Sequence, residues 1–472
     1  MVLKVFVGAV SIRWVYALLM FALMGNTGLQ GTDSIGYLQN AYYFAKATAS
    51  GSLHGFDWLG QNTGVMPVFA WLLGLNALLF QSFAPLTYVL MQGLIDAGTC
   101  VLIYYIAQSI DPRYALPAAI AACVNPTQIV ISGLVYTDTP FLFFVAVFLL
   151  ASIQWLSEPS WRWAAILGLG LGGATMVRAL AAPWTPGLLL FLLIVIAFQK
   201  RLSRRVFAQL LAATAIFAIC ISPVLWRNVS QFDTWAVTSQ GGLHLAFWVG
   251  PLVKESHDGT PWQQGYNAMQ KRVESRFPTS SDNPFENSRR YTEVAQEALA
   301  ELGPTAIAKA WLSGAAINIA APAIILSPPI STLPRTGFYG TLGASPFQKI
   351  GNFLFHSSNT IYAWILLTGI AGVAAIGAIQ LSGIFVIFRH RQHEAALLLF
   401  ALWFFYILAV NGPVASPKYR LPVEPVLMVL TAAGLTLFRR RAHSAISCGS
   451  MEAGFNVSVA PASASGSADR GG

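Results

Sequence analysis

The residues best placed to do chemistry are two aspartates that each stand at the start of an expected helix. Asp33 follows the first apolar stretch, and Tyr37 lies four residues further on, on the same face if a helix begins here. Asp138, in SGLVYTDTPFLFF, precedes another apolar stretch. Such a pair suits removal of a proton from a hydroxyl, with the second carboxylate orienting a substrate or holding a divalent cation. Alternatively, each aspartate only stabilises the positive end of its helix.

Arginines stand at the ends of apolar stretches, where a phosphate group could meet them. Arg178 and Arg227 each follow such a stretch, and Arg420 lies in KYRLPVEP beside Lys418 and Tyr419. A guanidinium can bind two phosphate oxygens at once, so we expect these arginines to hold a phosphate. If the stretches cross a membrane, ordinary anionic headgroups could equally receive them.

The histidines do not define a metal site. His54, His244 and His257 show no metal-ligand spacing, so the metal ligands are unknown and the need for a divalent metal stays open; no other cofactor is expected. Asp96 lies inside an apolar stretch, and Arg13 inside another. A carboxylate in that setting is either functional or tied to a neighbouring helix, for example through Arg13.

The elements that must position these residues are membrane helices. Of 472 residues, 55% are hydrophobic and only 10% charged, which one water-soluble core could not bury. A bilayer core of about 30 Å needs roughly 20 mainly apolar residues per helix, and helices satisfy their own backbone groups there. The sequence therefore predicts an all-α polytopic membrane protein with about 10 transmembrane helices. Two further segments, Met66–Phe80 and Thr305–Leu326, are expected to be interfacial or re-entrant.

Basic residues in short loops give the orientation. The formal net charge of +9 falls in tight groups between apolar stretches, which argues against nucleic acid as a partner. Such groups favour the cytoplasm, and placing Lys4, Arg113, Arg162 and the 200–205 cluster there puts both aspartates on the other side. We therefore expect a multi-pass protein of the plasma (inner) membrane with its active site on the extracytoplasmic side.

Four parts are expected along the chain. Residues 1–225 form an N-terminal membrane module with the first catalytic outer loop, and residues 226–358 form a long extracytoplasmic loop with an interfacial helix. Residues 359–438 supply the C-terminal membrane helices. Residues 439–472, rich in Ser, Ala and Gly, are expected to be a cytoplasmic disordered tail.

The order of these features resembles the GT-C membrane glycosyltransferases. The resemblance is to the family of the protein mannosyltransferases, the aminoarabinose transferases that act on lipid A, and the rhizobial galacturonosyltransferase-like domains. It rests on Asp33 and Tyr37 after the first span, the proline-led segment at Met66, the acidic turn at Asp138, and the sequences PVLWRN, SQGGLHLAFWVG and KYRLPVEP. One departure is that relatives often have His-Pro-Pro or Glu-Lys-Pro-Pro at the proline-led segment, where this chain reads Val-Met-Pro.

The resemblance implies a sugar transfer. A polyprenyl-phosphate-linked sugar would be the donor, and a hydroxyl of a lipid, glycan or protein the acceptor, with membrane lipids around the protein. Asp33 would be the base and Asp138 its support, while Arg420 and Arg227 would handle the lipid phosphate. His244 stands where relatives often have Asn. The residues predicted to bind the substrates are Tyr37, Arg178, Arg227, His244, Tyr419 and Arg420. A single displacement would invert the sugar centre.

Two other functions fit the same composition. A surface-polysaccharide ligase or polymerase would use the same lipid-linked donors and the same arginines. A polytopic transporter or flippase would place its polar residues near the membrane midplane, where this sequence offers only Asp96 and Arg13. Identifying the transferred group would separate these alternatives.

Overall fold

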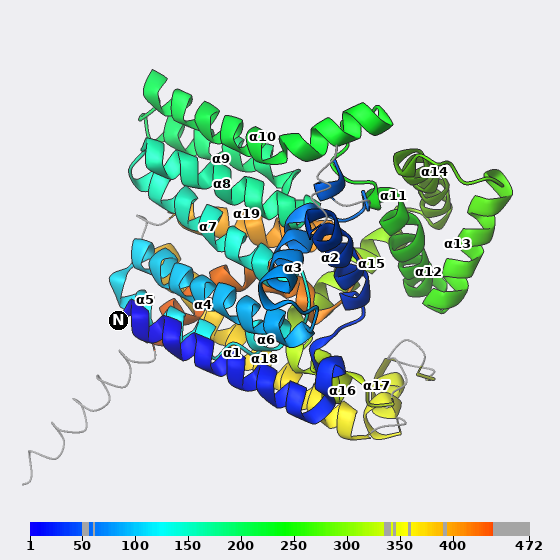
Figure 1. Ribbon diagram of the computed structural model, residues 1–472. Helices are drawn as coiled ribbons and strands as arrows, with labels where there is room; N and C mark the ends of the chain where they lie inside the picture. Colours follow the sequence, from blue (N-terminus) through cyan, green and yellow to red (C-terminus); the bar gives the residue numbers. More distant parts are fainter. Residues whose placement is uncertain are drawn as a thin grey trace, which may run out of the picture.

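The chain folds into helices joined by short turns. The computed structural model describes residues 1–49, 56–59, 62–334, 341–342, 346–356, 360–389 and 394–437, and within these residues it contains no β-strand (Figure 1). The expected tail, 439–472, and His54 lie outside the described residues.

Eight helical segments in the described residues are long and apolar enough to cross a membrane. They include α1 (Val2–Met24), α4 (Pro85–Ile110), α7 (Asp138–Ser157), α10 (Arg204–Phe232), α18 (Thr360–Arg389) and α19 (Glu394–Asn411). The other two join a short 3-10 turn to a helix: Ala179–Phe198, which contains α9 (Trp184–Phe198), and Pro417–Leu437. The all-helical polytopic fold is thus confirmed, with a number of spans close to the expected ten.

A broken helix would supply a ninth span. Helices α5 (Pro112–Cys123) and α6 (Pro126–Ser132) together are apolar enough to cross, but they meet at 47°. Pro126 lacks an amide hydrogen, and Asn125 accepts hydrogen bonds from Thr127 and Gln128, so a new helix begins directly after the break.

Helix α8 (Trp161–Val177) completes the main bundle. It packs between α7 and α10, while α4 packs against α1, α5 and α7. Gly168 and Gly172, one turn apart on α8, let α10 approach closely: an added Cβ at Gly168 would stand 2.5 Å from the carbonyl oxygen of Ala213. Small residues at such contacts are how membrane helices gain packing without a hydrophobic driving force.

Short helices lie outside this set of spans, as the sequence predicts. Helix α3 (Pro67–Phe80) has 14 residues and packs beside α2 (Ser34–Ala49). Helix α15 (Pro304–Ala320) has 17 residues and is not among the candidate spans. These two helices correspond to the segments expected to be interfacial or re-entrant.

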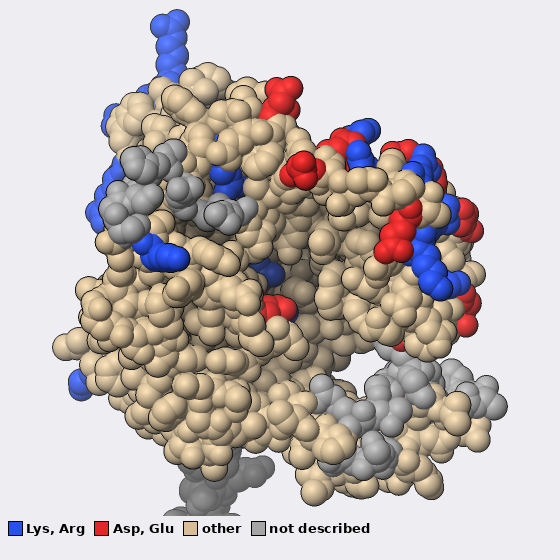
Figure 2. Space-filling model, turned by 45° about the vertical axis from the view of Figure 1, so that its right-hand side comes forward, with Lys and Arg blue, Asp and Glu red and all other residues tan. Residues whose placement is uncertain are grey.

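The expected long loop over 226–358 is itself largely helical. It holds α11 (Gln240–His244), α12 (Gly250–Asp258), α13 (Trp262–Arg276) and α14 (Pro284–Leu302), followed by α15, α16 (Pro328–Ser331) and α17 (Pro346–Phe355). Helices α11 to α14, with the π-helical turn Leu245–Val249, form what we call the polar lobe, beside the bundle in Figure 1. Acidic and basic side chains gather on its surface in Figure 2, where the bundle is mostly uncharged.

Candidate active site

Hydrogen bonds hold the segment before α2 against the segment before α7. The Val135 amide donates to the Leu29 carbonyl at 3.0 Å. The Ser34 hydroxyl donates to the Val135 carbonyl at 2.9 Å and accepts from the Gly31 amide at 2.8 Å. Asp33 and Asp138, 105 positions apart, are therefore brought together at one end of the bundle.

Each of the two aspartates has a cationic partner. Asp33 Oδ2 lies 2.8 Å from Lys418 Nζ, and Asp138 Oδ1 lies 2.5 Å from Arg178 Nη1. The Asp33 side chain is 45% exposed, whereas that of Asp138 is 3% exposed. The Asp138 pair is therefore a fixed internal ion pair, while the Asp33 carboxylate is open to an incoming group.

Tyrosines surround these pairs. Tyr37 on α2 bonds to Thr137 and lies near both aspartates and Arg178, and burial raises the pKa of its phenol. Tyr136 packs its hydroxyl against Gly31, where an added Cβ would overlap it, and Lys418 Nζ lies 4.9 Å from its ring centroid. Burial also raises the pKa of Tyr136, so both phenols stay neutral donors at physiological pH.

His244 and Tyr419 complete the group. Burial, together with the positive charge of Arg178, lowers the pKa of His244, so its imidazole is neutral at pH 7. Tyr419 lies next to Lys418, whose Nζ is 5.5 Å from its ring centroid, and its phenol is also close to Arg178. We call the whole set the carboxylate cluster: Asp33, Tyr37, Tyr136, Asp138, Arg178, His244, Lys418 and Tyr419.

The structure gathers six of the eight predicted site residues into this cluster. It adds Lys418 and Tyr136, which the sequence analysis did not select. Both could have been found from their positions in the sequence, because Lys418 is next to Tyr419 and Tyr136 precedes Asp138 by two residues. Figure 2 shows a hollow between the bundle and the polar lobe with acidic and basic side chains at its floor.

The side chain of Arg420 lies outside the carboxylate cluster, where three hydrogen bonds hold it. It donates to Glu424 Oε1 at 3.0 Å, to Thr127 Oγ1 at 3.0 Å and to the Ile319 carbonyl at 2.7 Å. Glu424 also accepts from Asn125, the residue that caps α6. Arg420 therefore stabilises the start of α6. The cation of KYRLPVEP that pairs with Asp33 is Lys418.

Arg227 lies near the C-terminal end of α10. It is 4% exposed, and its Nε donates to the side chain of Asn228 at 2.9 Å. The Asn228 amide in turn donates to the carbonyls of Ala236 and Val237. This contact ties Arg227 to the chain that leads into α11, and its phosphate-binding role stays a prediction.

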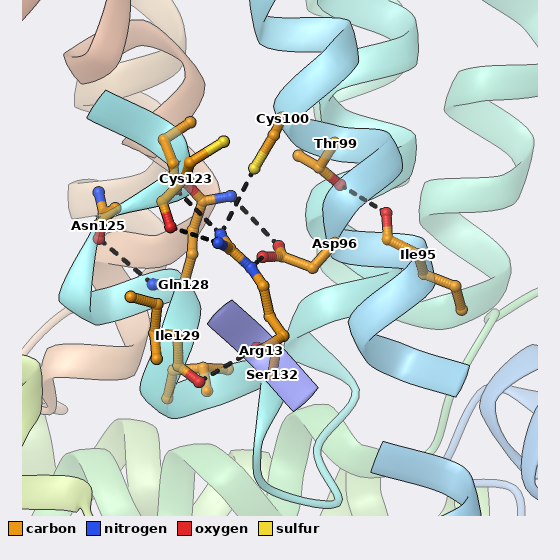
Figure 3. A network of polar contacts seen from close by, with 12 residues as sticks. Arg13, Ile95, Asp96, Thr99, Cys100, Cys123, Asn125, Gln128, Ile129 and Ser132 are labelled. Atoms are coloured by element: carbon orange, nitrogen blue, oxygen red, sulfur yellow. Dashed lines mark hydrogen bonds and ion pairs between the residues drawn. The ribbon is translucent and has the colours of Figure 1, made fainter. Parts of the chain in front are cut away.

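A second buried ion pair supports the broken helix (Figure 3). Arg13 Nε lies 2.8 Å from Asp96 Oδ2, and the guanidinium also donates to the carbonyls of Ala122 and Cys123. Those carbonyls end α5 and lack the usual donor four residues later, because Pro126 has no amide hydrogen and the Thr127 amide donates to Asn125 instead. On the α6 side, Gln128 donates to Asp96 at 3.2 Å. The network thus fixes the break, and α6 leads directly into the segment that carries Asp138.

The described residues offer no ligand set for a metal. No group of three or more His, Cys, Asp or Glu side chains in that part of the chain lies close enough to hold one. In the carboxylate cluster, each aspartate instead faces a cation.

Part of the chain matches a known protein family by sequence. Residues 62–226 match the family model described as dolichyl-phosphate-mannose-protein mannosyltransferase. No curated protein matches the chain by sequence.

Several solved structures are similar. The apo oligosaccharyltransferase of Archaeoglobus fulgidus matches with a TM-score of 0.54 at 12% identity, over 95% of this chain and 52% of that one. ArnT of Cupriavidus metallidurans, solved with undecaprenyl phosphate, matches with a TM-score of 0.39 at 14% identity, over 92% of this chain and 76% of that one. The chain thus spans about half the length of the oligosaccharyltransferase.

The protein therefore shares the membrane-helical GT-C fold of the Archaeoglobus fulgidus oligosaccharyltransferase. Within that fold, residues 62–226 carry the pattern of the dolichyl-phosphate-mannose-protein mannosyltransferase family.

Proposed function

We propose that the protein transfers a sugar from a polyprenyl-phosphate carrier to an acceptor hydroxyl on the extracytoplasmic face of the membrane. The observation that carries this proposal is the exposed Asp33 carboxylate, paired with Lys418 beside the buried Asp138–Arg178 pair. The cluster lies where the apolar bundle meets the polar lobe, so a lipid-borne donor and a water-borne acceptor could both reach it. The family matched by residues 62–226 is named for a dolichyl-phosphate sugar, which agrees with such a donor.

In the proposed reaction Lys418 binds the donor phosphate and Asp33 acts as the base. A phosphodiester donor would attract the ammonium of Lys418, which frees the Asp33 carboxylate to accept the proton of the acceptor hydroxyl. The acceptor oxygen then forms a bond to the anomeric carbon as the bond to the phosphate oxygen breaks, inverting that carbon. The polyprenyl phosphate leaves with the electron pair, and the positive charge of Lys418 stabilises it.

The remaining cluster residues hold these two in place. The Asp138 carboxylate is the counter-ion of Arg178 inside the protein, and burial together with the charge of Arg178 lowers the pKa of His244 and keeps its imidazole neutral. The neutral imidazole of His244 and the phenols of Tyr37 and Tyr419 are suited to donate or accept hydrogen bonds with sugar hydroxyls.

The expected side of the membrane follows from basic residues at the opposite end of the bundle. Arg201 donates to the carbonyls of Leu156 and Ser157, so the turns after α7 and after α9 lie together. Arg162, Arg204 and Arg205 adjoin these turns. Because basic short loops favour the cytoplasm, these contacts support the proposal that the carboxylate cluster, at the other end, faces the extracytoplasmic side.

The test is a transfer assay on purified protein in lipid. A panel of radiolabelled polyprenyl-phosphate sugars would be offered with envelope lipids and glycans as acceptors. The wild type should label one acceptor class, and Asp33→Asn should not, although it inserts normally. Asp282→Asn, which changes an exposed aspartate in the polar lobe, is the matched control.

Other outcomes would replace the proposal. Undiminished transfer by Asp33→Asn would remove Asp33 from the mechanism. Transfer of a preassembled glycan in place of one sugar would favour a ligase or polymerase. An unchanged envelope with altered solute uptake in cells that lack the gene would favour transport.

A further inference from the structure

The polar lobe contains a pocket of about 620 Å³, distinct from the carboxylate cluster. Its walls come from the end of α11, the π-helical turn, α13, α14 and the 277–280 turn. Six aromatic side chains line it: Phe247, Trp248, Trp262, Tyr266, Phe277 and Tyr291. Pockets of this volume commonly hold small ligands.

The aromatic rings form a partly exposed platform. Trp248 and Trp262 are stacked with centroids 5.0 Å apart, and Tyr266 adjoins Trp262 at 5.4 Å. Trp248 is 43% exposed, although it stands on a lobe with a charged surface. Large exposed aromatic groups on such a surface indicate a binding site, because folding alone gains little from leaving them in water.

Planar polar groups share the pocket. Gln270, Glu274, Asn287 and Arg290 are among the lining residues. In the part of the chain that the structure describes, neither the Tyr266 nor the Tyr291 hydroxyl has a hydrogen-bond partner, so both could bond to a ligand. This combination fits a pyranose ring, whose C–H face can stack on an indole while its hydroxyls bond to amides, carboxylates and phenols. Within the lobe, Gln270 already bonds to Glu274, Asn287 to Ser281, and Arg290 to Glu286. The two phenol hydroxyls are therefore the polar groups that a lipid chain in the pocket would leave without a partner.

Helix α11 joins the pocket to the carboxylate cluster. Leu243 lines the pocket, and the next residue, His244, lies close enough to Arg178 for that charge to lower its pKa. Successive residues of a helix point about 100° apart, so α11 can direct Leu243 into the pocket and His244 towards the carboxylate cluster. The π-helical turn that follows carries Phe247 and Trp248, and π-helical turns occur frequently at functional sites.

We propose that this pocket binds pyranose units of a glycan acceptor and holds the acceptor next to the carboxylate cluster. The acceptor role rests on the proposed function, whereas saccharide binding does not. The acceptor class is thereby narrowed from lipid, glycan or protein to a molecule that already carries sugar.

Binding can be measured without catalysis. Saturation-transfer NMR on the full-length protein in detergent would use the methyl glycosides of mannose, glucose, galactose and N-acetylglucosamine, together with cellobiose, as probes. At least one probe should bind, and Trp248→Ala should weaken it about tenfold, as expected for loss of one stacking platform. Trp248 is 43% exposed and has no described side-chain hydrogen bond, so we expect its removal to destabilise the fold little. Trp235→Ala, at a 76% exposed tryptophan outside the pocket, is the control.

The outcomes separate this proposal from the proposed function. Asp33→Asn should bind the probe like the wild type while losing transfer. If no probe binds the wild type, or if Trp248→Ala binds as tightly as the wild type, the pocket is not a saccharide site, whatever the transfer assay shows. Binding of unglycosylated peptides with the same dependence on Trp248 would also overturn it, in favour of a protein acceptor.

Discussion

The two aspartates of the carboxylate cluster differ in burial, and this predicts opposite consequences when each becomes asparagine. Asp138→Asn leaves Arg178 charged and largely buried without its counter-ion. Breaking a fully buried pair costs about 3–5 kcal/mol, and the 20% exposure of Arg178 reduces that somewhat. Asp33→Asn loses an ion pair whose carboxylate is 45% exposed but whose ammonium, on Lys418, is only 14% exposed. Because Lys418 also lies near the negative charge of Asp138, it is not left without a counter-ion, and we expect a loss near that of an exposed pair, about 0–1 kcal/mol.

Among the molecules that remain folded, Asp33→Asn should lose more transfer activity than Asp138→Asn, the reverse of their order in stability. Asp33→Asn removes the proposed base and should slow transfer by about 10²–10⁴-fold at nearly wild-type stability. Asp138→Asn should lower the apparent melting temperature, and the molecules that stay folded should keep more activity than Asp33→Asn. Thermal unfolding in detergent and the radiolabel transfer assay give the two measurements on the same preparation.

A double variant tests the ion-pair explanation. Asp138→Asn/Arg178→Gln removes both charges and should recover much of the stability that Asp138→Asn loses, because no unpaired charge remains inside. If Asp33→Asn were as unstable as Asp138→Asn, or if the double variant were less stable than Asp138→Asn, the assignment of one catalytic and one structural carboxylate would be refuted.

Three further predictions follow from single contacts. Lys418→Met should raise the KM for the lipid donor by about 10–100-fold, as expected for a lost charged hydrogen bond, and an unchanged donor KM would argue against phosphate binding there. Arg13→Met should lower thermal stability more than Arg13→Met/Asp96→Leu, because the single change leaves a buried carboxylate unpaired; equal melting temperatures would contradict this. The pKa of His244 is lower in the folded protein than in the unfolded chain, so the unfolded chain binds more protons at this site below about pH 6.5. The free energy of unfolding should therefore fall as the pH drops below that value. His244→Asn should reduce that loss, as measured by melting temperature between pH 7.5 and 5.5.

The membrane fold could be predicted from the sequence because lipid imposes a simple requirement. Long apolar runs such as 85–110 and 360–389 form spanning helices whatever surrounds them. Met66–Phe80 was expected not to span because it is short, and the structure shows a 14-residue helix there. The polar stretch 226–358 lacks such a signal, and its helices were mostly missed because their amphipathic faces are satisfied only by packing against one another.

The candidate site was predicted in part. Asp33 and Asp138 could be selected because carboxylates are uncommon beside membrane-spanning apolar runs, and Tyr37 because it lies one helical turn after Asp33. Arg420 and Lys418 stand two positions apart on a 3-10 helix, and no local pattern tells which of them faces Asp33. The answer depends on Glu424 and Thr127, which hold Arg420 on the other side.

The sequence by itself determined that this chain is a bundle of membrane helices with carboxylates and cations at their ends, since hydrophobic burial depends on composition along short segments. Only the tertiary structure decided which charges pair. Asp33 and Lys418 are 385 positions apart, and their contact exists because the 25–33 segment, the 133–137 segment and the 417–423 turn meet at one end of the bundle. Ion pairing depends on distances of a few ångströms, and such distances are set by packing between helices that are remote in the sequence.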